Sequence, residues 1–375
     1  MSPHDRLKAR PLPPPLPVAR DATETTLAFD DNRVLATVLG LYDQNLAKVE
    51  RRLGVEAHAN GNQLTIKGPP EAGAHARRVV ERLYALAASG ASLGLGDVDG
   101  AIEECALQGE LFEEAAKSAS PKSASPTAPS AFDTIATRKR GFVRARNAAQ
   151  DAYLRALKRH ELVLAEGPAG TGKTWLAVGY AVSLLEQGAV ERIILSRPAV
   201  EAGERLGFLP GDMRDKVDPY LRPIFDALND FMDGRMVERG LQTGMIEVAP
   251  LAFMRGRTLT NACVLLDEAQ NTTSVQMKMF LTRLGENSRM VVSGDPTQID
   301  LPPGQRSGLG EAIALLSRVE GVAHIVFREA DVVRHDLVRR IVDAYGAAAK
   351  VDAAKMDAAK MDAGKAAASG GERGR

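Results

Sequence analysis

The stretch ELVLAEGPAGTGKTWLAVGYAVSLL (residues 161–185) decides the fold. It reads as an apolar strand, a glycine-rich loop and an apolar helix. The loop matches the pattern GxxxxGK[ST] in the context that this pattern requires, with a strand before it and a helix after it. The residues predicted to bind phosphate are Gly167, Pro168, Ala169, Gly170, Thr171, Gly172, Lys173 and Thr174.

The residue types in this loop suit a nucleotide. Glycines let backbone N–H groups turn inward around phosphates without Cβ clashes, and the helix N-terminus adds partial positive charge. Lys173 can reach the β- and γ-phosphates, and the Thr174 hydroxyl can ligate Mg²⁺. The sequence therefore predicts a site for ATP with Mg²⁺, although the loop alone does not distinguish a kinase, a GTPase or a motor.

A second apolar run carries acidic residues at its end. NACVLLDEAQNTT (261–273) reads as a buried strand from Ala262 to Leu266, followed by Asp267 and Glu268. Asp267 is predicted to hold Mg²⁺, and Glu268 to act as the general base that polarises the attacking water. This pair favours a hydrolase over a small-molecule phosphotransferase. The alternative is an acidic pair that is merely solvated after a strand.

Two further strands are predicted to end at the same edge. SRMVVSGDPTQID (288–300) places Gln298 where it can contact the γ-phosphate or the attacking water. ERIILSRPAV (191–200) points Arg197 toward either the nucleotide or a nucleic-acid backbone. Four apolar strands alternating with helical stretches predict an α/β fold, a doubly wound parallel sheet of the RecA-like P-loop type.

The region before this one is smaller. It reads as a strand (26–30), one helix with apolar residues spaced from Val34 to Leu53, a hairpin around Asn60–Gly61 and a helix closed by Gly90. This order is similar to a minimal KH-type nucleic-acid-binding module, an α+β domain. The nearest match to its GXXG backbone clamp is Gly40-Leu41-Tyr42-Asp43, which lacks the second glycine. RNA binding and a role in assembly or docking both stay open.

The chain divides into five predicted segments. They are a proline-rich arm (1–23), the KH-like domain (24–112), a Ser/Pro-rich flexible linker (113–137), the P-loop domain (138–346) and a low-complexity tail (347–375).

Lys and Arg together number 48, as do Asp and Glu, so no strong global attraction to nucleic acid is expected. Two distant cysteines form no CxxC pair. Neither a transmembrane run nor a signal peptide is recognised, so we expect a cytoplasmic protein without membrane association.

Four motifs together resemble a known family. GPAGTGKT, SRPAV, LLDEAQ and SGDPTQ are similar to motifs I, Ia, II and III of superfamily 1 helicases. Residues 138–346, with APLAFMRGRTL, GDPTQIDLP and DVVRHDLVRRIVDAY, resemble the PhoH-like ATPases more closely still, and the region before them resembles the KH-like domain of that family's longer members. The resemblance implies ATP hydrolysis, a single-stranded RNA substrate and ribosomal RNA metabolism, often beside a ribosome-associated endoribonuclease.

Two site residues follow from the resemblance. Gln150, in ARNAAQDAYLRAL, matches the adenine-reading glutamine, and an amide can donate and accept at once. Arg334, in DVVRH, occupies the place of the arginine that stabilises the transferring phosphoryl group. The alternatives are an ordinary surface glutamine and an arginine on an amphipathic helix.

The length of the chain after the P-loop domain favours an oligomer. A superfamily 1 helicase closes its ATP site between two RecA-like domains, and the residues after Tyr345 are too few for a second one. We therefore expect a homo-oligomer, by family resemblance a hexamer, in which Arg334, Arg255 or Arg257 reaches a neighbour's site. The alternative function is an ATP-gated oligomeric scaffold or nucleic-acid-binding adaptor without unwinding activity.

A basic run from Arg138 to Arg146 is expected either to bind RNA phosphates or to be a solvated helix face.

Overall fold

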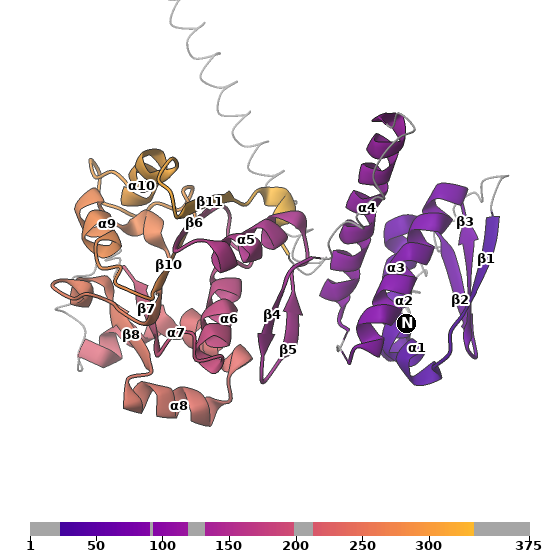
Figure 1. Ribbon diagram of the computed structural model, residues 1–375, viewed down its shortest axis with the longest axis horizontal. Helices are drawn as coiled ribbons and strands as arrows, with labels where there is room; N and C mark the ends of the chain where they lie inside the picture. Colours follow the sequence, from indigo (N-terminus) through magenta and orange to yellow (C-terminus); the bar gives the residue numbers. More distant parts are fainter. Residues whose placement is uncertain (1–22, 91–92, 119–131, 199–212, 334–375) are drawn as a thin grey trace, which may run out of the picture.

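The computed structural model describes residues 23–90, 93–118, 132–198 and 213–333. These residues form two units, a smaller one with a three-stranded sheet and a larger one with a six-stranded sheet (Figure 1). No helix in the described part of the chain is long and apolar enough to cross a membrane.

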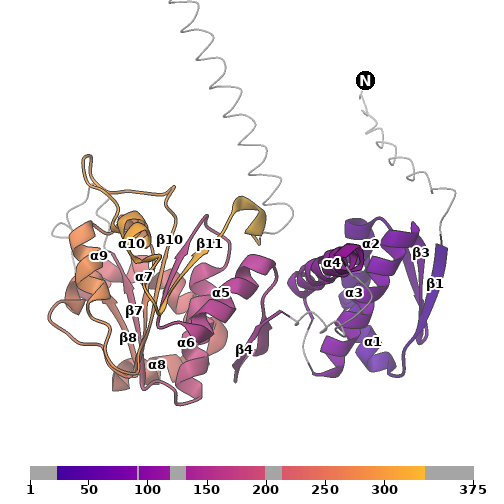
Figure 2. The ribbon, with the colours of Figure 1, turned by 45° about the horizontal axis from the view of Figure 1, so that its top comes forward.

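The smaller unit is an antiparallel sheet with helices on one face (Figure 2). Its elements are β1 (Thr23–Ala28), α1 (Asn32–Leu39), α2 (Gln44–Leu53), β2 (Glu56–Asn60), β3 (Gln63–Gly68), α3 (Pro70–Ala88) and α4 (Leu95–Ser118). The strand order is β1-β3-β2: β3 pairs with β2 through the hairpin and with β1 on its other edge. Buried apolar side chains of both layers, such as Leu35, Leu64 and Val79, form its core.

The single helix predicted from Val34 to Leu53 is wrong, because the chain breaks at Gly40. Gly40 has a φ of 77°, and a Cβ added there would lie 2.7 Å from the Asn45 side chain. Tyr42 and Asp43 also have left-handed backbone, and Leu41 is 69% exposed instead of facing the core. Two helices therefore replace one, and the KH-like character of this unit stays a prediction.

The larger unit contains the elements that surround the glycine-rich loop. They are β4 (Thr134–Thr137), β5 (Gly141–Arg144), α5 (Ala148–Arg159), β6 (Leu162–Glu166), α6 (Lys173–Glu186), β7 (Arg192–Arg197), α7 (Met213–Phe231), α8 (Gly234–Thr243), β8 (Ile246–Pro250), η3 (Leu251–Met254), β9 (Ala262–Leu266), η4 (Ala269–Asn271), α9 (Ser274–Leu281), β10 (Arg289–Gly294), α10 (Gly308–Leu316), β11 (Val322–Val326) and η5 (Glu329–Asp331).

The predicted parallel sheet is confirmed, in the order β11-β6-β10-β9-β7-β8. All five neighbouring pairs are parallel, so the carboxyl ends of the strands lie along one edge. The strand before the loop, β6, is separated from the acidic strand, β9, by β10, which is the RecA-like P-loop arrangement. Two edge strands, β8 (IEVAP) and β11 (VAHIV), were not predicted.

Alternate residues of the central strands pack on opposite faces of this sheet. On β6, Val163 and Ala165 face a core shared with α5, α6 and α7, while Leu162 and Leu164 face a core shared with α9 and α10. Both faces are therefore covered, as parallel sheets require, and the sheet edge is left for a ligand.

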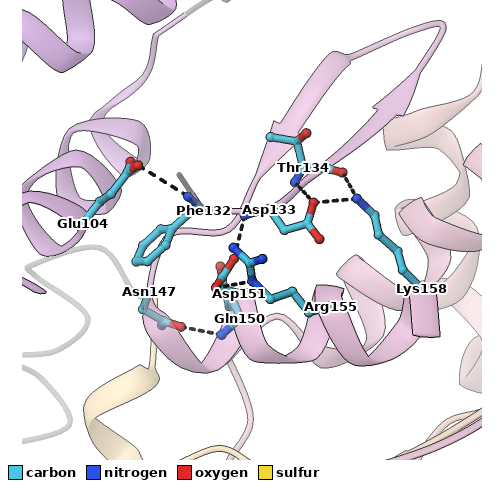
Figure 3. Close-up of polar contacts among 9 residues, drawn as sticks. All are labelled: Glu104, Phe132, Asp133, Thr134, Asn147, Gln150, Asp151, Arg155 and Lys158. Carbon is cyan, nitrogen blue, oxygen red and sulfur yellow. Dashed lines mark hydrogen bonds and ion pairs between the residues drawn. The ribbon is translucent and has the colours of Figure 1, made fainter. Parts of the chain in front are cut away.

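The two units meet where α4 approaches the start of the larger unit. The Glu104 carboxylate accepts a hydrogen bond from the Phe132 backbone N–H (3.4 Å, Figure 3) and pairs with Arg144 (3.3 Å). Glu103 accepts from the Ala148 N–H at the start of α5 (3.1 Å). Helix α4 runs to Ser118 and β4 begins at Thr134, so regular structure occupies both ends of the segment 113–137 that was expected to be a linker.

Candidate nucleotide site

The glycine-rich loop leaves β6 and enters α6 in the predicted context. Gly167 has a φ of 141°, and an added Cβ would lie 2.3 Å from the Phe327 backbone oxygen, so only glycine fits. Gly172 has a φ of 88° and immediately precedes α6. The loop is tied to its surroundings by bonds from Gly167 N–H to the Gly294 oxygen (3.1 Å) and from Val333 N–H to the Gly170 oxygen (3.0 Å). The loop backbone is thus held at the N-terminus of α6, where an anion is favoured.

Lys173 is the cation of this loop. Its side chain is buried, and Nζ donates to the backbone oxygens of Gly167 (2.7 Å) and Pro168 (2.8 Å) and to Thr171 Oγ1 (3.2 Å). Burial lowers the pKa of the Lys173 ammonium, and the nearby carboxylates of Asp295, Asp267 and Glu268 oppose that shift. The charge therefore lies inside the loop, where phosphate oxygens can replace the carbonyl partners.

Thr174 and Asp267 lie together although they are far apart in sequence. Thr174 Oγ1 donates to Asp267 Oδ1 at 2.7 Å, and Ser293 Oγ donates to the same carboxylate oxygen at 2.9 Å. The Asp267 backbone is fixed by its N–H bond to the Ser196 oxygen at 2.9 Å. This donor set, a hydroxyl and a carboxylate beside a phosphate loop, fits Mg²⁺, which takes one or two protein oxygens together with substrate phosphates and water.

Glu268 is held by partners on both sides. It has left-handed backbone, with a φ of 53°, directly after the buried strand β9. Its Oε1 is 3.1 Å from Arg197 Nη2, and its Oε2 accepts from Gln270 Nε2 at 2.6 Å. The predicted general base and the arginine that ends β7 therefore form an ion pair at the edge of the site.

Gln270 is a site residue that the sequence reasoning missed. Its fully buried amide accepts from the Asp295 N–H (3.0 Å) and donates to Glu268 and to the Gln298 backbone oxygen (3.1 Å). It connects the loop after β9 to the loop after β10. The signal available was a glutamine three residues after Asp267, which the pattern could not distinguish from a surface residue.

Gln298 lies at the predicted edge and contacts Asp295. Its Nε2 donates to Asp295 Oδ2 at 2.5 Å, and Thr297 donates to Asp295 Oδ1 from both its backbone and its hydroxyl. Burial raises the pKa of Asp295, but these hydrogen bonds and Lys173 outweigh it and hold that pKa below its ordinary value. Asp295 is therefore an ionised anchor that orients Gln298.

A cavity of about 450 Å³ unites most of these groups. Among the residues that line it are Lys173, Thr174, Arg197, Asp267, Glu268 and Gln298, with Asp226 and Asp230 of α7 on another wall. A larger cavity, about 1480 Å³, lies around the amino ends of the strands, near Glu191, Asn261 and Arg289. Because none of the predicted phosphate- or metal-binding residues lines the larger cavity, the smaller one is the candidate nucleotide site.

Gln150 lies beneath the loop. Its buried amide donates to the Thr171 backbone oxygen (3.0 Å) and accepts from the Arg146 N–H (2.8 Å), while its own N–H bonds to the Asn147 side chain that caps α5 (2.8 Å, Figure 3). The structure therefore shows a contact with the phosphate loop, and adenine reading stays a prediction. Arg334 lies outside the described residues.

Arg255, Arg257 and the arginines of the basic run differ in their exposure and in their ion-pair partners. Arg257 makes two bonds to Glu247, at 2.5 and 2.7 Å, whereas Arg255 is exposed. The helix face that was one of the two alternatives for the basic run is wrong, because residues 138–146 form the turn of the β4–β5 hairpin, β5 itself and the irregular segment that leads to α5. Within that run, Arg140 pairs with Asp230 (3.0 Å) and Arg144 with Glu104, so both have structural partners.

Trp175 is partly buried and packs against the core of the larger unit. Its ring lies 4.6 Å from the Phe231 ring between centroids, and its Nε1 donates to Asp230 at 2.8 Å. It thus attaches α6 to α7 beside the cavity.

Comparison with known proteins identifies a family to which this chain is similar. A family model described as PhoH-like protein matches residues 142–346. A PhoH-like protein of Mycobacterium tuberculosis is 48% identical over 308 residues, which cover 82% of this chain and 84% of that protein. A PhoH-like protein of Bacillus subtilis is 45% identical over 82% of this chain and 93% of its own length. Protein PhoH of Escherichia coli is 48% identical over 54% of this chain and 57% of its own.

Proposed function

Because the chain belongs to the PhoH-like protein family, we propose that it hydrolyses ATP with Mg²⁺ and that single-stranded RNA stimulates this hydrolysis. The observation that carries the proposal is one cavity that contains a phosphate-loop lysine, a hydroxyl–carboxylate pair and a second carboxylate beyond that pair. A kinase has no need of a water-activating carboxylate, whereas a hydrolase does.

Each residue of the cavity has its own role in the proposed hydrolysis of ATP. Lys173 and the loop N–H groups bind and neutralise the β- and γ-phosphates. Thr174 and Asp267 would hold Mg²⁺, which supplies charge neutralisation at the phosphate oxygens when bound. Glu268 takes a proton from water as the water oxygen bonds to the γ-phosphorus. The bond from that phosphorus to the β–γ bridging oxygen breaks, leaving ADP and phosphate.

The position of Gln298 at the sheet edge suits a residue whose contacts change with the bound nucleotide. Its side chain is oriented by Asp295, and its backbone oxygen is bonded to Gln270, which also holds Glu268. Movement of the loop after β10 would therefore change the position of the general base, Glu268, through the buried amide of Gln270. This link supports a site in which turnover responds to a second ligand.

We also propose that the active form is a homo-oligomer in which an arginine from a neighbour completes the site. Arg257 is occupied by Glu247, which leaves Arg255 and Arg334 as the arginines of this proposal.

Steady-state ATP turnover with single-stranded RNA, with single-stranded DNA or with neither tests the proposal. Wild type should turn over ATP faster with RNA, Lys173→Ala should lose turnover and nucleotide binding, and Glu268→Gln should keep binding while losing turnover. Hydrolysis that no nucleic acid changes would favour an ATP-gated scaffold instead. Absence of hydrolysis in every oligomeric state would refute the role given to Glu268.

A further inference from the structure

Arg197 contacts the general base from the side opposite Gln270. Its Nη2 lies 3.1 Å from Glu268 Oε1, and the side chains are 21% and 34% exposed, so water and ions can reach the pair. Both carboxylate oxygens of Glu268 are engaged, one by Arg197 and the other by Gln270. A general base must lie within hydrogen-bond reach of the water it activates. The orientation of Glu268 is therefore set in part by a guanidinium that is open to solvent.

Arg197 is also the last residue of β7, beside the end of β8. It lies opposite Pro250 in the parallel register, and the chain then continues into η3. In η3 the Phe253 side chain is 53% exposed, and Arg255 follows it on the surface. The bidentate pair of Arg257 with Glu247 anchors this loop to β8.

An exposed aromatic ring beside cationic side chains is the combination that binds single-stranded nucleic acid. Bases stack on the ring, and guanidinium groups bind the backbone phosphates. The planar guanidinium fork fits carboxylate and phosphate alike, so a phosphate competes directly with a carboxylate for the same arginine. At this edge, Arg197 lines the candidate nucleotide cavity and already binds Glu268.

We propose that Arg197 is shared between two anions: it restrains Glu268 when no RNA is bound, and it transfers to a backbone phosphate of single-stranded RNA lying along the ends of β7 and β8. This coupling rests on the proposed RNA-stimulated hydrolysis. The transfer releases Glu268 Oε1 for the attacking water, while the bond from Gln270 keeps the carboxylate in the cavity. RNA thus stimulates turnover by removing a restraint on the base.

The test compares Arg197→Ala and Arg197→Gln with wild type in basal and RNA-saturated ATP turnover, using a single-stranded RNA homopolymer. Loss of the restraint should raise the basal rate several-fold, and the ratio of stimulated to basal rate should fall toward one. The matched control is Arg77→Ala, which removes an equal charge from an exposed i,i+4 pair on α3 and should leave both rates as in wild type. Binding of a fluorescent ATP analogue shows whether each variant retains the folded site.

The outcomes separate this inference from the function on which it rests. If wild type is stimulated by RNA but the Arg197 variants have an unchanged or lower basal rate, Arg197 only binds RNA or only supports the fold, and the inference is overturned alone. If RNA does not stimulate wild type, the proposed function is overturned together with the coupling. Phe253→Ala should raise the RNA concentration needed for half-maximal stimulation, and an unchanged value would remove η3 from the binding surface.

Discussion

Gln150 donates a 3.0 Å hydrogen bond to the backbone oxygen of Thr171, so the helix before β6 directly supports the phosphate loop. The same amide accepts from the Arg146 N–H. We expect Gln150→Ala to destabilise the protein by about 1–3 kcal/mol, because it leaves the buried Thr171 oxygen and the half-buried Arg146 N–H without their partner. Thermal unfolding measures this loss.

Nucleotide binding by the same variant distinguishes the two roles of Gln150. Because the contact that the structure shows is with the loop, we expect affinities for ATP and GTP to fall together. A selective loss for ATP would identify the adenine contact instead. Gln276→Ala, which removes a side chain from the capping box of α9, is the control.

Asp267→Asn should abolish most of the turnover while preserving the fold. The asparagine keeps the acceptor for Thr174 and Ser293 but removes the charge that would hold Mg²⁺. We expect a loss of at least about a hundredfold in turnover, since charge stabilisation by a metal is worth several kcal/mol. Titration with Mg²⁺ at fixed ATP checks it, and a rate near that of wild type would exclude Asp267 as a ligand.

Gln270→Ala should uncouple the two loops at the sheet edge. The variant loses the bonds to Glu268, to the Asp295 N–H and to the Gln298 oxygen. ATP binding should persist because Lys173 and the loop are untouched, whereas kcat should fall. A mutant that loses binding and turnover equally would show a purely structural role, and a Gln270→Glu variant tests whether the donor to Glu268 is the part that matters.

The pair of Asp133 and Lys158 predicts a dependence of stability on pH. Burial raises the pKa of Asp133, but the hydrogen bonds from Lys158 and the Thr134 N–H (Figure 3) outweigh it, so the folded pKa lies below the unfolded one. A lowered carboxylate pKa stabilises the fold above the unfolded value, about 3.9, and that contribution disappears as pH falls through the folded pKa. Asp133→Asn should therefore cost on the order of 1 kcal/mol or less near pH 7, and the difference from wild type should vanish in acid. Denaturant unfolding at several pH values measures it.

The central part of the site was predictable because each of its residues follows a strand. Lys173, Thr174, Asp267, Glu268 and Gln298 leave β6, β9 and β10 at one edge, and the apolar runs that form these strands are unambiguous. Positions that depend on contacts between distant segments were not predictable. The ion pair of Arg197 with Glu268 depends on which strands become neighbours, and strand order is not visible in apolar periodicity.

Local backbone geometry accounts for the errors. The spacing from Val34 to Leu53 suited one helix, but a glycine whose φ is positive and whose hydrogen is packed against Asn45 ends it. Likewise, a helix face was one of the two alternatives for the basic run, because alternation over the short strands β4 and β5 is too brief to be recognised.

The junction between α4 and the larger unit constrains how this chain can be recombined. A Cβ on Gly96 would lie 2.4 Å from the Arg146 guanidinium carbon, and one on Gly100 would lie 3.2 Å from the Arg146 Cα. The Arg146 side chain can move away from a larger residue at position 96, whereas at position 100 the close neighbour is backbone. Any chimera that joins the first unit of one relative to the second unit of another must therefore bring a helix with a small residue at position 100. The units are separable in the sequence, but they are matched as a pair.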